Sequence, residues 1–296
     1  MNVVHKFGTV ILGMAVLVAT VGAQTPIPTY KPGSSPQAAS PDFNSPRPIE
    51  AVDSVMMNEM TWMEVRDAMK AGKTTVIIAT GGLEQNGPYL VTDKHNIVLR
   101  ATTEAIARKL GNALVGTIVP YVPEGEIDPP TGHMRYPSTV TVTDATFKAL
   151  LTDIASSYRQ HGFAHLILIG DSGGNQKGMK EVAETLSVKW GGKPTIHYIP
   201  EYYNYDETKD WVAANLGIKE VDEGLHDDFE ISSSMMTVDP NSVRLPQRIK
   251  AGKATINGVP LAPADQAIAI GRKIVDFRAT QTVKAIQKAL GTRPSE

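Results

Sequence analysis

The amino-acid sequence predicts an α/β fold in which a mostly parallel sheet is covered by helices on both faces. Short apolar runs of five or six residues alternate along the chain with longer segments of helical periodicity, the order that βαβ units produce. The runs are continuously apolar rather than alternating, as strands buried on both faces are. The 296 residues, of which 42% are hydrophobic, are enough to bury one large core.

Each predicted element rests on its own local pattern. The helices have apolar residues three or four positions apart, as Trp62, Val65 and Met69 are in the first, and several end at a glycine. The strands are runs rich in Val, Ile and Leu. The last helix is expected to break at Gly271, because glycine disfavours a helix interior. In chain order the expected elements are helix 61–71, strand 74–79, helix 95–110, strand 113–119, helix 143–161, strand 165–169, helix 176–190, strand 195–199 and helix 265–290.

Three segments of different composition divide the chain. Residues 1–23 predict a signal peptide, because a short basic start precedes an apolar stretch and small residues stand at Val21 and Ala23, before the expected cleavage point. The alternative is an uncleaved N-terminal anchor. Residues 24–50 contain seven prolines and predict an extended tether, and residues 51–296 are expected to form the folded domain. This organisation predicts a periplasmic or secreted protein.

The composition excludes several classes of function. The chain has no cysteine, which excludes disulfides, thiolate metal sites and a cysteine nucleophile, so a metal would need His, Asp or Glu ligands. The formal net charge of −2 gives no electrostatic footprint for nucleic acid or an anionic membrane. A small molecule is therefore the expected partner.

The candidate chemistry lies in the loops that follow the strands, because ligands bind beyond the carboxyl ends of parallel strands. In the loop 81–96, Glu84 follows two glycines and His95 begins the next helix, a pair of side chains that could bind a divalent metal. The alternative is a solvated glutamate and a helix-capping histidine. The loop 120–138 is long, rich in proline and contains His133, which is typical of a functional loop or of a subunit interface.

A third loop, 170–175, has the sequence GDSGGN between a strand and a helix. It fits the G-x-S-x-G pattern of a nucleophile elbow, with Ser172 as the nucleophile. A phosphate-binding turn at a helix N-terminus is the alternative. Farther along, His226 precedes a run of acidic residues and serines and is the only histidine in the C-terminal third of the chain, so it is an acid/base candidate.

Five motifs in this order resemble those of the creatininase (creatinine amidohydrolase) family, from about residue 61 to residue 240 and more weakly to the end. The resemblance implies a three-layer α/β/α sandwich. It also implies a homo-oligomer, often a hexamer, and metal-dependent hydrolysis of cyclic or formyl amides. The segments that carry it are GLEQNGP at 82–88, HMRYPST at 133–139, HGF at 161–163, GDSGGN at 170–175 and HDDFEISS at 226–233.

The resemblance implies a metal site in which only some of the family's ligands are present in this chain. Glu84 matches a family metal ligand, and His95 stands where the family has an aspartate ligand. Asn86 and Ser172 stand where the family has metal-binding histidines. The implied ligands of a divalent zinc or manganese ion are therefore Glu84 and His95, with Asp171 as a further ligand.

The remaining site residues follow from the same motifs. His226 matches the proton-shuttling histidine of the family. His133, Tyr136 and Asn86 are expected to contact the substrate.

Three hypotheses about function remain open at this point. The first is an exported creatininase-like hydrolase that cleaves a C–N or ester bond in a small cyclic amide, formamide or lactone. The second is a metal-free hydrolase in which Ser172 is the nucleophile and His226 its base. The third is a non-catalytic protein that binds a small molecule on the same scaffold.

Overall fold

The computed structural model describes residues 42–221 and 226–292. Contacts divide the chain into Met1–Pro48 and Ile49–Glu296, and every element discussed below belongs to the second unit. The signal peptide expected at 1–23 and residues 24–41 of the expected tether lie outside the described residues. In the described ranges, no helix combines the length and the apolar character that a membrane span requires.

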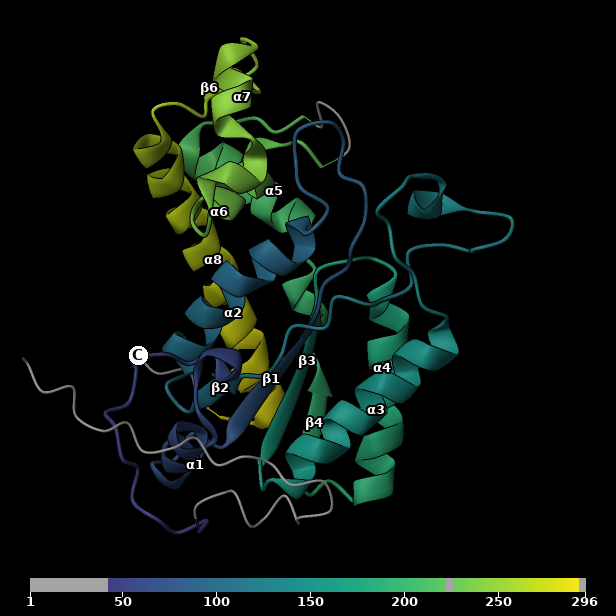
Figure 1. Ribbon diagram of the computed structural model, residues 1–296, viewed down its shortest axis with the longest axis vertical. Helices are drawn as coiled ribbons and strands as arrows, with labels where there is room; N and C mark the ends of the chain where they lie inside the picture. Colours follow the sequence, from purple (N-terminus) through teal and green to yellow (C-terminus); the bar gives the residue numbers. More distant parts are fainter. Residues whose placement is uncertain (1–41, 222–225, 293–296) are drawn as a thin grey trace, which may run out of the picture. The chain divides into compact units, whose positions relative to one another are not determined.

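The central sheet is parallel throughout (Figure 1). Its strand order is β2-β1-β3-β4, which places β1 and β3 in the middle. Both central strands are buried along almost their whole length, because they consist of aliphatic residues that face helices on either side. The strands are β1 (Thr75–Thr80), β2 (Ala113–Val115), β3 (His165–Gly170) and β4 (Thr195–Tyr198).

Strand β2 is shorter than the run 113–119 that the sequence predicts. Regular pairing ends after Val115, and the next bridge to β1 joins Val119 to Thr80. Gly116 lies at the interruption, where a Cβ atom would approach the Tyr158 hydroxyl to 2.5 Å. Tyr158 therefore packs against the backbone at the point where the strand loses its regular register.

Helices cover both faces of the sheet, which confirms the predicted α/β fold (Figure 1). One face packs on α3 and α4, and the other packs on α2 and α8. Alternate side chains of one strand therefore pack into two hydrophobic cores. Val76 and Ile78 of β1 face the core with α3 and α4, and Ile77 faces the core with α2 and α8. These helices are α2 (Lys94–Leu110), α3 (Asp144–Gln160), α4 (Asn175–Trp190) and α8 (Ala264–Leu290), preceded by α1 (Trp62–Lys70).

Helix α8 runs without interruption, so the predicted break at Gly271 is wrong. A Cβ atom at Gly271 would lie 2.2 Å from the carbonyl oxygen of Ser233 in α6. The glycine is needed because the backbones of α6 and α8 approach closely there, and tertiary packing overrides the low helix propensity of glycine.

A third core lies beyond the sheet and was not predicted from the sequence. It is built on the first half of α8 and the start of α2, and it is capped by α6, which contributes Phe229 and Met235. Its elements are α5 (Tyr205–Leu216), α6 (Phe229–Met236), α7 (Leu245–Lys250) and the hairpin of β5 (Thr255–Ile256) and β6 (Val259–Pro260). Short 3-10 helices complete the chain at η2 (Met57–Glu59), η3 (Gly132–Arg135), η4 (Pro200–Tyr202) and η5 (Pro240–Val243).

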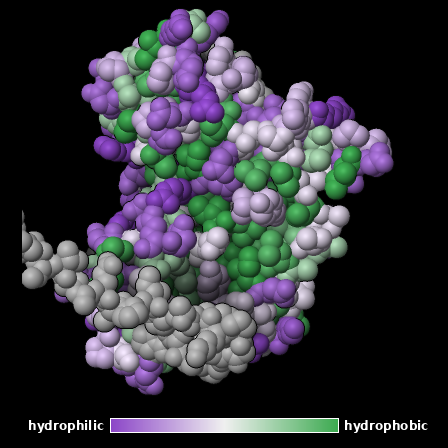
Figure 2. Space-filling model, in the orientation of Figure 1, coloured by the Kyte–Doolittle hydropathy of each residue, from purple (hydrophilic) through white to green (hydrophobic). Residues whose placement is uncertain are grey.

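Apolar side chains also reach the surface. Figure 2 shows polar residues over α7 at the top of the view and apolar residues gathered in the middle of the same face. The segment 116–142 alone exposes Tyr121, Ile127, Tyr136 and Val140. Exposed apolar residues that gather in one region indicate a surface that another molecule can cover.

Candidate active site

The candidate site lies at the carboxyl ends of β1 and β3, the edge of the sheet where the sequence predicted it. A cavity of about 450 Å³ opens there. The loop after β1 supplies Glu84, α2 supplies His95, and the loop after β3 supplies Ser172. The other lining residues are Pro123, Glu124, Gly125, His133, Asp144, Gly173, Gly174, Tyr203 and His226.

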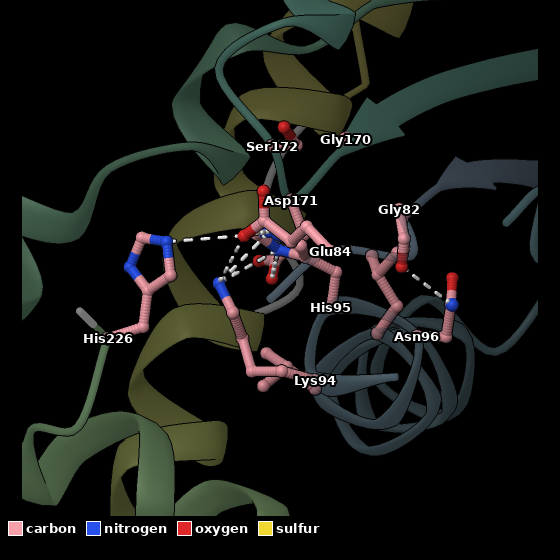
Figure 3. Close-up of polar contacts among 12 residues, drawn as sticks. Gly82, Glu84, Lys94, His95, Asn96, Gly170, Asp171, Ser172 and His226 are labelled. Carbon is pink, nitrogen blue, oxygen red and sulfur yellow. Dashed lines mark hydrogen bonds and ion pairs between the residues drawn. The ribbon is translucent and has the colours of Figure 1, made fainter. Parts of the chain in front are cut away.

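Glu84 is the centre of the site (Figure 3). Its carboxylate is 2% exposed and faces three imidazoles. Oε1 lies 2.7 Å from Nε2 of His95 and 3.2 Å from Nε2 of His226, and Oε2 lies 3.1 Å from Nε2 of His133. Burial alone raises the pKa of Glu84, but hydrogen bonds with His226 and His95 outweigh it and hold the pKa well below its usual range.

His95 lies between two carboxylates. Its Nε2 faces Glu84, and its Nδ1 lies 2.9 Å from Oδ2 of Asp171. The three residues expected as metal ligands are brought together, in a row joined by the imidazole.

Asp171 is fixed from its other side by a buried arginine. Arg278 Nη2 donates to Oδ1 at 3.1 Å, and the Tyr205 hydroxyl donates to the same oxygen at 2.9 Å. The guanidinium lies over the rings of Tyr202 and Tyr205, 5.0 and 4.6 Å from their centroids. Burial raises the pKa of Asp171, but the hydrogen bond with His95 and the Arg278 charge lower it overall, to about 2.

A different set of residues has the geometry to hold an ion. Ligand atoms of Glu84, His133 and His226 all lie within 4.8 Å of one another. The two imidazole rings are half-buried, and their centroids lie 6.1 Å apart. Two histidines and one glutamate form a ligand set of catalytic zinc sites, which keep a further position open for water or substrate.

Lys94 is the least expected member of the site. It is 1% exposed, and its Nζ lies 3.0 and 3.1 Å from the two ring nitrogens of His95 and 3.8 Å from Oε1 of Glu84. Burial lowers the pKa of Lys94, while the charges of Asp171 and Glu84 oppose the decrease. A lysine at the first position of a helix is usually exposed, so this contact could not be predicted from the sequence.

Glu124 is a second carboxyl group of the cavity that the sequence did not single out. It is buried, and a Cβ atom at Gly82 would come within 2.2 Å of its Oε1. Burial and repulsion from Glu84 raise the pKa of Glu124 to about 9, so the group is neutral at pH 7. The cavity thus holds one ionised and one protonated carboxyl group.

The other predicted site residues lie in different environments. Ser172 lines the cavity, but among the described residues no hydrogen bond joins it to His226, and its backbone φ is not positive. Asn86 is buried and donates from Nδ2 to the backbone carbonyls of Glu84 and Val91. Tyr136 is 52% exposed and lies outside the cavity lining.

Two more carboxyl groups lie at the start of α6, where Glu230 is buried and Glu220 is partly buried. Neither carboxylate oxygen of Glu230 has a hydrogen-bond partner among the described residues. Burial raises the pKa of Glu230 to about 8. Glu220 accepts hydrogen bonds from the backbone N–H groups of Phe229 and Glu230, and burial raises its pKa to about 7.

Glu230→Gln should make the protein more stable at alkaline pH. The folded state keeps a proton on Glu230 that the unfolded chain loses above about pH 4.5, so the free energy of unfolding of the wild type falls as pH rises from 4.5 to 8. The variant lacks this contribution, and we expect a gain of about 2–4 kcal/mol at pH 8 and none at pH 4. Urea unfolding at both pH values measures it. Glu201→Gln, at an exposed position, is the control, and an unchanged pH dependence in Glu230→Gln would contradict the prediction.

Fold and site together define an α/β protein with a carboxylate and several imidazoles at the carboxyl edge of a parallel sheet. The chain belongs to the creatininase family. The profile of that family, described as creatinine amidohydrolase, matches residues 58–284, which is more than half of the chain. The resemblance found in the sequence motifs is confirmed, and family membership supports a hydrolase of the amidohydrolase type.

Individual relatives are more distant. A creatinine amidohydrolase of Pseudomonas putida is 27% identical over 116 residues, which are 39% of this chain and 44% of that protein, so the match spans less than half of the relative. A manganese creatininase structure has a TM-score of 0.57 at 19% identity and covers 80% of this chain and 99% of its own. A mutant creatininase of the Zn-Zn type has a TM-score of 0.54 at 21% identity and covers 81% of this chain and 98% of its own. At these identities the structures show the fold alone.

Proposed function

We propose that the protein is an exported hydrolase that cleaves a C–N bond in a small cyclic amide or formamide, or the ester bond of a lactone. The observation that carries the proposal is the convergence of Glu84, His133 and His226 at the cavity. We assign these three side chains as the ligands of one divalent ion. The donor set fits zinc or manganese, the ions named for creatininase structures of the same fold.

Such an ion would polarise the scissile carbonyl and lower the pKa of a water molecule. The chain's own residues supply the rest of the site. Glu124 lines the same cavity, where its carboxyl group can form a hydrogen bond with a bound substrate. A cavity of about 450 Å³ accommodates a small molecule, and Tyr203 and Gly173 line it without charge.

The test is to purify the mature chain, expected to begin at Gln24, from the exported fraction. Its metal content is measured, and turnover is screened on cyclic amides, formamides and lactones before and after chelation. We expect about one ion per chain and an activity that chelation removes and zinc or manganese restores. Tight binding without turnover of any substrate would favour the binding-protein hypothesis.

Two histidine variants separate the roles of His226. If His226 is a metal ligand, His226→Ala and His133→Ala should both lower the metal content. If His226 is the acid/base catalyst that its motif predicts, only His133→Ala should do so. His226→Ala would then keep the ion and lose turnover by a factor on the order of 10²–10⁴.

Ser172→Ala should leave turnover within a factor of about three of the wild type. The residue lines the cavity, but the structure gives it no hydrogen bond to His226 of the kind that activates a serine nucleophile. Steady-state kinetics on the best substrate measures the effect. A loss on the order of 10³-fold or more, with the metal content unchanged, would favour the metal-free hydrolase instead.

The proposal includes a homo-oligomer. The resemblance implies one, and the exposed apolar side chains of Tyr121, Ile127 and Val140 support it. Light scattering of the purified chain gives its mass in solution, and a monomer at micromolar concentration would contradict this part of the proposal.

A further inference from the structure

Lys94 requires an explanation that the proposed function does not supply. It is the only lysine in the described ranges that is almost completely buried, and it does not line the cavity. Burying an ammonium group is costly unless opposite charges surround it. Its place is therefore determined by the groups that its Nζ faces.

Those groups form a cluster of potential metal ligands, which we call the inner cluster: Glu84, His95 and Asp171. Nζ lies within 3.1 Å of both ring nitrogens of His95 and 3.8 Å from Oε1 of Glu84. Figure 3 shows the Lys94 side chain reaching into this cluster from the start of α2. Burial lowers the pKa of Lys94, and among the surrounding charges those of Asp171 and Glu84 oppose this most strongly.

We propose that the Lys94 ammonium is the fixed cation of the inner cluster and takes the place of one metal ion. The inference rests on the proposed function for the remaining ion, which Glu84, His133 and His226 hold. A relative of the same fold is of a two-zinc type. In this chain the first cation is the Lys94 ammonium, which is covalently part of the protein. The second is the exchangeable metal ion.

The geometry disfavours a direct chemical role for Lys94. A nucleophilic amine would have to reach the substrate, and this Nζ is enclosed by His95 and Glu84 rather than facing the cavity. The ammonium instead offsets the negative charge of the inner cluster, as a bound cation would. Lys94 is therefore a positioning residue for Glu84 and His95.

The test compares the metal capacity of the wild type with that of Lys94→Ala, which removes the ammonium and leaves room for an ion. Equilibrium dialysis against Mn²⁺, followed by elemental analysis, should show one more ion per chain in the variant than in the wild type. Lys209→Ala is the matched control, because Lys209 Nζ lies 3.8 Å from Asp228, outside the inner cluster, and its capacity should equal that of the wild type. Equal capacities of wild type and Lys94→Ala would overturn the proposal.

A second measurement covers the case in which Lys94→Ala folds poorly. Its melting temperature in EDTA should rise on addition of saturating Mn²⁺ by about 5–10 °C more than that of the wild type, because the ion binds only the folded state. Ethylammonium, which replaces the missing group, should also raise it. A response to Mn²⁺ no larger than that of the wild type would overturn the proposal.

The outcome is independent of the activity test. If the wild type binds no ion and Lys94→Ala binds one, the inference about Lys94 holds and the proposed catalytic ion fails. If the wild type is active with one ion and the variant binds no more, the proposed function holds and the inference about Lys94 fails.

Discussion

Glu84→Gln should remove both the bound ion and the hydrolytic activity of the protein. The substitution keeps the shape of the side chain but removes the charge that three imidazoles and an ammonium face. It also replaces one carboxylate oxygen by an amide nitrogen, which has no lone pair for a metal. We expect metal affinity to fall at least about 100-fold and turnover on the order of 10³-fold.

Elemental analysis and steady-state kinetics of the purified variant measure these losses. Glu126→Gln is the control, since it makes the same chemical change at an exposed position of the loop that lines the cavity. A Glu84→Gln protein with the wild-type metal content and turnover would contradict the central role of Glu84. Loss of turnover with an unchanged metal content would mean that Glu84 acts on the substrate or on His226 rather than on an ion.

The sequence predicted where this site lies, because the strands and the loops that follow them depend on local patterns. Continuous aliphatic runs produced β1 and β3, and parallel strands carry their following loops to one edge of the sheet. Glu84 and Ser172 therefore line the same cavity although 88 positions separate them. Among the predicted strands, only β2 has regular pairing that is markedly shorter than expected.

The sequence could not predict which charged groups are buried. Lys94 and Arg278 occur in helices whose exposed positions also carry charges, and no periodicity distinguishes a lysine that faces Glu84 from one that faces water. Glu124 lies in a loop rich in proline and acidic residues, where a solvated carboxylate is expected. Their burial depends on tertiary contacts between segments far apart in the sequence, as the 107 positions between Asp171 and Arg278 illustrate.

His133 and His226 are an intermediate case. Their residue type and their loops marked both as functional candidates, one for substrate and one for acid/base chemistry. The contact of both imidazoles with the same carboxylate depends on tertiary contacts that bring His133, in η3, and His226, just before α6, to the loop after β1. That contact groups them with Glu84 as a possible metal site, a role that the sequence motifs assigned to other residues.

Arg278→Met should produce the largest loss of stability among single substitutions at the site. The guanidinium is 4% exposed, donates to Asp171 and packs on the rings of Tyr202 and Tyr205. Methionine fills much of the same space but leaves Asp171 buried with one cation fewer. Breaking a buried ion pair in this way costs about 3–5 kcal/mol, which corresponds to a decrease in melting temperature of about 6–20 °C.

Thermal and urea unfolding of the metal-free protein measure the loss without interference from the ion. Arg272→Met is the matched control, because Arg272 is exposed on the same helix and its replacement should change stability by less than about 0.5 kcal/mol. An Arg278→Met protein within about 1 kcal/mol of the wild type would contradict the prediction.

The double variant Asp171→Asn with Arg278→Met distinguishes the ion pair from simple packing. If Arg278 stabilises the fold by neutralising Asp171, removing the carboxylate charge as well should recover part of the loss, because no unpaired buried charge remains. If Arg278 acts mainly by packing on the two tyrosines, the two losses should add. Recovery would also show how the inner cluster is supported: Arg278 holds Asp171, and Asp171 orients the imidazole of His95 that faces Glu84.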